Sequence, residues 1–141
     1  MPVQIHLSDI KFNDSTEDFE TFLTFNSKSY DLSICDFDKN DYGQAKALAL
    51  KIKEWLENNL TEAKEYAASK LLKLKNENWL SEQEKPLSLS KFIETIEFDG
   101  ILAFSEGSFE IYFNDHDLFW GHTIIVDISE TFEFENANIA G

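Results

Sequence analysis

Two histidines with an aspartate and a tryptophan between them are the side chains of this sequence best suited to chemistry. His116 and His122 flank Asp117 and Trp120. Imidazole and carboxylate groups bind zinc, but a zinc site needs three or four ligands in tetrahedral geometry, and two histidines six residues apart with one nearby aspartate are a weak indication of such a site. We therefore predict no metal and no cofactor. The alternative hypothesis is a small-ligand or enzymatic pocket near Asp117, Trp120 and His122.

The segment that begins at Asp36 has the first half of a calcium-binding loop. Asp36, Asp38 and Asn40 stand at the first, third and fifth ligand positions. However, the loop needs a glycine where Asp41 stands and a bidentate glutamate where Ala47 stands. We interpret the segment as an Asx-rich turn that leads into a helix.

No other pattern favours catalysis. Cys35 is the one cysteine, and the sequence around it lacks the histidine that would activate a nucleophilic thiol. The 27 acidic residues make any carboxylate pair uninformative about glycosidase chemistry. The sequence also lacks a glycine-rich phosphate loop and a G-x-S-x-G elbow. We predict that the protein is not an enzyme.

The net charge of −15 limits the classes of partner. All 12 basic residues are lysines, so the clustered arginines that bind phosphate are missing, and we predict no nucleic-acid binding. The 141 residues fit one domain, and we expect residues 1–141 to form it. The N-terminus resembles no signal peptide, and no long apolar run is present. These features predict a cytoplasmic protein with no membrane association.

The elements that would position these side chains follow from hydropathy. Strand-like alternation over residues 3–7, 18–25 and 29–36 precedes helical spacing over 43–78. Asn59, with Glu62 three residues later, predicts a break, hence two long helices at about 43–59 and 60–78. A short third helix is expected near residues 91–96. Strands are expected at 101–104, 109–113, 123–128 and 131–134. The fold class is therefore α+β: an antiparallel sheet of N-terminal strands and a C-terminal meander, with the three helices packed on one face.

The C-terminal strands predict an acidic surface. Residues 92–141 hold 11 acidic residues and no lysine. Because side chains alternate between the faces of a strand, one solvent-facing row should collect acidic side chains around a tyrosine. Such a face either keeps the protein soluble or attracts a basic partner. The predicted partner-binding residues are Glu110, Tyr112, Asp127, Glu133 and Glu135.

Residues 117–122 have the sequence Asp-Leu-Phe-Trp-Gly-His, and residues 137–141 have the sequence Ala-Asn-Ile-Ala-Gly. Together with Asn78-Trp79-Leu80 and Asp99-Gly100, this pattern resembles a bacterial domain family of unknown function with a Phe-Trp-Gly-His signature. Related small acidic domains are candidate immunity proteins of polymorphic toxins. The resemblance implies a cytoplasmic immunity protein that neutralises a cognate toxin domain, with a basic toxin suiting the acidic surface.

Overall fold

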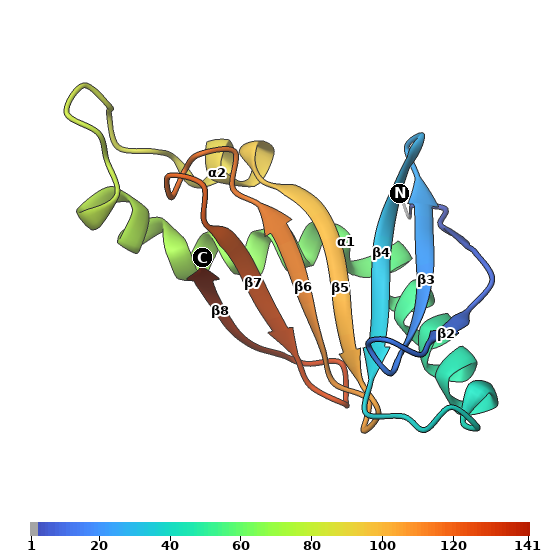
Figure 1. Ribbon diagram of the computed structural model, residues 1–141. Coiled ribbons are helices and arrows are strands. Elements are labelled where there is room, and N and C mark those ends of the chain that lie inside the picture. Colours follow the sequence, from blue (N-terminus) through green and yellow to red (C-terminus); the bar gives the residue numbers. More distant parts are fainter. Residues whose placement is uncertain (1–2) are drawn as a thin grey trace.

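A long helix crosses one face of an eight-stranded sheet in the computed structural model, which describes residues 3–141 (Figure 1). None of the helices described for those residues has the length and apolar character needed to cross a lipid bilayer. In chain order the elements are β1 (His6–Leu7), β2 (Lys11–Asn13), β3 (Asp18–Phe25), β4 (Lys28–Cys35), α1 (Tyr42–Asn78), α2 (Leu89–Thr95), β5 (Glu97–Phe104), β6 (Phe109–Asn114), β7 (Thr123–Ile128) and β8 (Phe134–Ala140).

The sheet consists of two antiparallel blocks joined by one parallel pair. The strand order is β1-β3-β4-β5-β6-β7-β8, and β2 also pairs with β3. The β3–β4 hairpin and the β5–β8 meander are antiparallel, whereas β4 and β5 run parallel because α1 carries the chain from one to the other. The mixed α+β class and the mostly antiparallel sheet are thus confirmed. The sequence pattern did not predict the parallel pair.

The prediction of two long helices is wrong, because α1 runs unbroken for 37 residues. At the expected break, the side-chain amide of Asn58 donates to the carbonyl oxygen of Glu54 at 2.9 Å, and that of Asn59 to Trp55 at 2.8 Å. Both asparagines therefore bond back to the preceding turn of the same helix. The buried stripe also continues past them, so packing on the sheet keeps the helix continuous through this polar pair.

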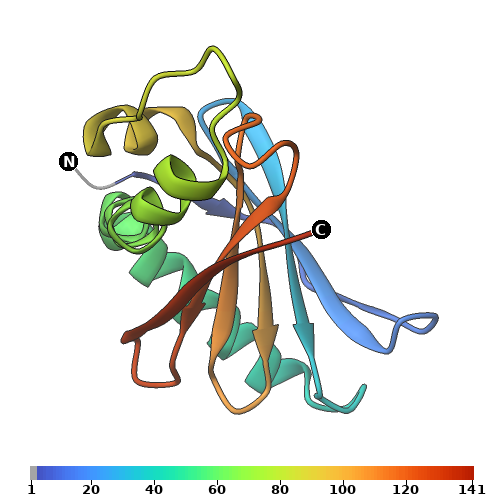
Figure 2. The ribbon, with the colours of Figure 1, turned by 90° about the vertical axis from the view of Figure 1, so that its left-hand side faces the viewer.

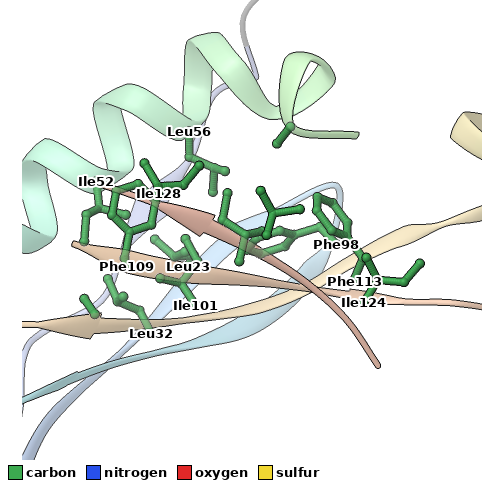
Figure 3. Packing of buried hydrophobic residues seen from close by; sticks show 14 of the residues in the cluster. Leu23, Leu32, Ile52, Leu56, Phe98, Ile101, Phe109, Phe113, Ile124 and Ile128 are labelled. Atoms are coloured by element: carbon green, nitrogen blue, oxygen red, sulfur yellow. The ribbon is translucent and has the colours of Figure 1, made fainter. Parts of the chain in front are cut away.

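The core lies between α1 and the sheet (Figure 3). Ile52 and Leu56 of α1 meet Phe109 and Ile128 from the middle of the meander. Buried alanines along α1 let the helix approach the sheet closely, and large aromatic and aliphatic side chains from the strands fill the remaining space. The buried alanines of α1 are Ala45, Ala49, Ala63, Ala67 and Ala68.

The short helix α2 does not pack on the face of the sheet, where the sequence analysis had placed all three helices. It packs against α1, and its buried Phe92 meets Phe119 of the β6–β7 loop with ring centroids 6.0 Å apart. Ser88 caps its N-terminus by accepting the backbone N–H of Lys91 at 3.2 Å. The helix therefore closes one end of the core, and the structure has two helices in residues 3–141 where three were expected.

The last strand begins later than predicted. Residues 129–133 form a turn in which the Ser129 N–H donates to the Glu133 carbonyl at 2.9 Å, and Phe132 has a positive φ of 64°. Strand β8 then uses Ala137 and Ile139 to pack toward the core. Ala137 is small, and asparagines lie next to both residues. The alternation of apolar and polar residues is therefore too weak to indicate this strand from the sequence.

Candidate functional site

One face of the sheet packs against α1, and no element of the part described, residues 3–141, covers the other (Figure 2). Along β6, Phe109, Ile111 and Phe113 are buried toward the helix, while Glu110 and Tyr112 point to the uncovered side. We call this uncovered surface the open face. Its outward residues on β3 to β8 include Glu20, Phe22, Asp31, Ser33, Gly100, Leu102, Glu110, Tyr112, Ile125, Asp127, Asn136 and Asn138.

Strand register brings residues that are distant in sequence into two neighbouring rows of the open face. Each row crosses the parallel β4–β5 pair and so joins the hairpin to the meander. One row reads Phe22, Asp31, Gly100, Tyr112, Ile125 and Asn138. The next reads Glu20, Ser33, Leu102, Glu110, Asp127 and Asn136.

The open face is acidic and its charges are unpaired. No outward position of β3 to β8 is a lysine, although Lys11 of β2 lies in register with Glu20 at the edge. Within residues 3–141, the carboxylates of Glu20, Asp31, Glu110 and Asp127 form no ion pair. Seven of the 12 lysines lie on α1, on the other side of the sheet. The negative potential of the protein is therefore concentrated on the uncovered side.

Three of the five predicted partner-binding residues meet in the middle of this face. The Tyr112 hydroxyl donates to Glu110 Oε1 at 2.6 Å, and Glu110 lies opposite Asp127 in register. Burial, followed by the hydrogen bond to Glu110, raises the pKa of Tyr112. Burial, followed by the charge of Glu110, raises the pKa of Asp127. The two adjacent carboxylates repel each other, so this arrangement costs stability at neutral pH.

The other two predicted partner-binding residues, Glu133 and Glu135, lie outside the central cluster of Glu110, Tyr112 and Asp127. Glu133 lies in the turn before β8, where its carboxylate accepts the Thr131 hydroxyl at 2.8 Å. Glu135 is at the irregularity that shifts the register between Asp127 and Ile128. The outward positions of β8 beside the cluster are therefore asparagines. Partner binding by Glu133 and Glu135 stays a prediction.

Replacing Asp127 with asparagine is expected to stabilise the protein at pH 7 by a few tenths of a kcal/mol. A carboxyl group whose pKa is raised on folding binds its proton more tightly in the folded state, so ionisation of Asp127 lowers stability as pH rises. The advantage of Asp127→Asn should shrink as the solution is acidified through the raised pKa of Asp127, and should vanish once the carboxyl is protonated in both the folded and the unfolded state. Urea unfolding at neutral and at acidic pH measures it, with Glu54→Gln on α1 as the control. A destabilised Asp127→Asn variant at pH 7 would contradict this account.

The alternative ligand pocket near Asp117, Trp120 and His122 falls in the loop between β6 and β7. Trp120 is 59% exposed and its ring meets that of Trp79 at 4.8 Å. The His122 ring also lies against Trp79, at 5.0 Å. His122 Nδ1 is 2.6 Å from the Phe119 carbonyl oxygen, and so donates to it. Trp120 and His122 thus come together on Trp79, whereas Asp117 occupies an exposed turn with a φ of 68°.

Asp115, which the sequence analysis did not single out, organises this loop. Its side chain is buried, and its two carboxylate oxygens accept three backbone N–H groups. These come from Phe119 at 2.8 Å and from Asp117 and Gly121 at 3.2 Å each. Residues with positive φ follow Asp115 in this turn, which is a common arrangement where an aspartate side chain bonds to the backbone of the residues after it. The Asp115 carboxylate therefore holds the loop through backbone amides of the loop itself, and its role is structural.

The loop after α1 positions Trp79 under these side chains. Lys75, whose side chain is fully buried, donates to the Trp79 carbonyl oxygen at 2.6 Å and pairs with Glu84 at 2.9 Å. Asn76 exchanges two hydrogen bonds with the backbone of Leu87, at 2.7 and 3.0 Å. The C-terminal turn of α1 therefore fixes the chain that follows it.

The residues that the sequence offered as metal ligands or as a nucleophile make hydrogen bonds within the fold. His116 Nε2 lies 3.2 Å from Glu97 Oε1, whereas His122 bonds to Phe119, and Asp38 and Asn40 form a turn before α1. Burial raises the pKa of the Cys35 thiol to about 11. Among residues 3–141 no group of three or more His, Cys, Asp or Glu side chains is arranged to hold a metal ion.

The sequence matches the model of one protein family over residues 5–139, which is nearly its whole length. That family is described as "Uncharacterized protein conserved in bacteria (DUF2262)". No curated protein and no solved structure matches the chain significantly. The resemblance to a bacterial family of unknown function is thereby confirmed at this coarse level.

Proposed function

The chain belongs to the DUF2262 family of uncharacterized proteins conserved in bacteria, and we propose that it neutralises a bacterial toxin by direct binding. In this proposal it is an immunity protein that acts in the cytoplasm without catalysis. Its open face docks on a basic surface of the toxin and blocks the active site or the cleft that leads to it. The observation that carries the proposal is the uncovered, acidic face of the sheet.

The chemistry of the open face favours a protein partner. Phe22 is 51% exposed, and Leu102 and Ile125 are partly exposed on the same side. Apolar side chains among unpaired carboxylates give an interface both area to bury and charge to steer the encounter. A nucleic acid would be repelled by the same carboxylates. A second copy of the chain would bring two like-charged faces together, which disfavours self-association here.

Growth rescue tests this function. Toxin domains encoded beside the gene for this chain are expressed in bacterial cells with and without it, and binding is measured with the purified proteins. We expect the chain to restore growth and to bind with an association rate that falls steeply as salt is added. If no neighbouring gene encodes a toxin, or if growth is not rescued, the proposal is overturned.

Charge reversal locates the contact surface. Glu20→Lys with Asp31→Lys changes two exposed positions of the open face, and rescue should be lost, with association slowed about tenfold or more. The matched control is Glu54→Lys with Glu65→Lys, which makes the same change of net charge on exposed positions of α1. Equal loss in both double variants would show that only net charge matters, and would contradict docking through the open face.

A further inference from the structure

The middle of the open face is hollowed above Gly100. The hollow has a volume of about 520 Å³ and is lined by residues of β4 to β8. Gly100 lies between Asp31 and Tyr112 in register, at a position where every neighbouring strand has a side chain. A Cβ atom added there would lie 3.1 Å from the Asp31 carbonyl oxygen. The glycine therefore keeps the floor of the hollow open, and an added methyl group would be crowded by one backbone atom, the Asp31 carbonyl oxygen.

The walls of the hollow are apolar and aromatic. Leu102 and Ile125 line it on either side of Tyr112, and all three are partly exposed. The hydrogen bond from the Tyr112 hydroxyl to Glu110 fixes the orientation of the tyrosine ring. The hollow thus offers a rigid aromatic wall that needs no rearrangement when a ligand enters.

Two carboxylates stand at the rim. Asp31 is exposed on β4, and Asp99 is exposed at the irregularity of β5 that falls between Phe98 and Gly100. Within residues 3–141 neither carboxylate forms an ion pair, whereas the nearby Glu97 pairs with both Lys28 and His116. In the described part of the chain, neither rim carboxylate therefore has a cation within ion-pair distance.

We propose that this hollow receives an arginine side chain from the basic protein that docks on the open face. The inference rests on the proposed function and names the chemistry of its central contact. The aliphatic stem of the arginine packs on Leu102 and Ile125, the guanidinium plane stacks on Tyr112, and its N–H groups donate to Asp31 and Asp99. An ammonium group fits less well, because lysine is more strongly hydrated and lacks the planar fork.

Short peptides test the hollow without the toxin. The probes are acetyl-Gly-Arg-Gly-amide and the same peptide with lysine or with citrulline, which has the shape of arginine and no charge. Binding is followed through the backbone amide resonances of Gly100, Leu102 and Tyr112. We expect the arginine peptide to shift these resonances, with the lysine peptide about threefold weaker and the citrulline peptide about tenfold weaker.

Two variants assign the binding to the hollow. Gly100→Ala places a methyl group in its floor, and Asp31→Asn removes one rim charge at an exposed position without changing volume. Each should weaken the arginine peptide about tenfold, and Asp31→Asn keeps the test decisive if Gly100→Ala does not fold. Glu54→Gln on α1 is the control and should bind as the unmodified protein does.

The outcomes separate this inference from the proposed function. Equal binding of the arginine and citrulline peptides, or shifts spread over α1, would overturn the arginine site. The same shifts with spermine would mean unspecific attraction of polycations and would also overturn it. If Gly100→Ala folds and still rescues growth fully, docking on the open face stands and its arginine contact does not. If rescue fails with the unmodified chain, the toxin function falls while the peptide result remains interpretable.

Discussion

Replacement of Asp115 by alanine is expected to lower the free energy of unfolding by about 3 kcal/mol. The buried carboxylate accepts N–H groups from Asp117, Phe119 and Gly121, and alanine leaves all three donors without their acceptor. Charged acceptors form the stronger class of hydrogen bond, so the loss should exceed that of a neutral contact. Thermal unfolding followed by circular dichroism should show a melting temperature lower by about 10 °C.

Two matched variants separate the carboxylate of Asp115 from the charge of the loop. Asp115→Asn keeps one acceptor oxygen and turns an amide N–H₂ toward a backbone donor, so about half of the loss is expected. Asp117→Asn alters an exposed residue two positions away, and should change stability by less than about 0.5 kcal/mol, because asparagine tolerates the positive φ. If Asp117→Asn proves as damaging as Asp115→Ala, the loop is not organised by Asp115.

Asn59→Pro is expected to destabilise the protein by about 3 kcal/mol or more. Residue 59 lies inside α1, where proline would remove the N–H that donates to the preceding turn and would press its ring against the carbonyl of Trp55. That carbonyl would also lose the hydrogen bond that it accepts from the Asn59 side chain. Urea unfolding measures the loss, and a fall in helical circular dichroism should accompany it.

The control is Asn59→Ala, and the size of its effect on stability distinguishes one helix from two. In a continuous helix alanine is the better helix former, so the loss of one partly exposed hydrogen bond should leave stability within about 0.5 kcal/mol. If Asn59 instead capped a second helix, alanine would cost about 1 kcal/mol and proline at residue 60 would be tolerated. A tolerated Leu60→Pro would therefore contradict the unbroken α1.

Much of the fold was predictable because its signals are local. The alternation of Phe109, Ile111 and Phe113 indicated a strand with one buried face, and the structure confirms it. The helical spacing across residues 43–78 was also right, and only the break was wrong, since Asn59 and Glu62 mimic a cap that tertiary packing overrides. Strand β8 was misplaced because Ala137 and Ile139 give too weak an apolar pattern.

The open face could be predicted only in part, since its composition depends on strand register. Glu110, Tyr112 and Asp127 are neighbours on adjacent antiparallel strands, and alternation alone placed them together. Asp31 and Gly100 meet through the parallel β4–β5 pair, which no local pattern specifies. Asp115 was missed for a related reason: its three hydrogen bonds go to backbone groups, and backbone partners leave no mark in the pattern of side chains.

We expect the open face to be completed late in folding, because it includes the parallel pair of β4 and β5, here called the seam. The hairpin and the meander each pair strands that are close in sequence, whereas Asp31 and Gly100 meet only after α1 has carried the chain across the sheet. Closing so long a loop costs conformational entropy before the contacts between the two strands can form. Contacts between residues that are far apart in sequence therefore slow folding. A partner that binds across the seam recognises only chains that have finished folding, and it raises their resistance to unfolding by mass action.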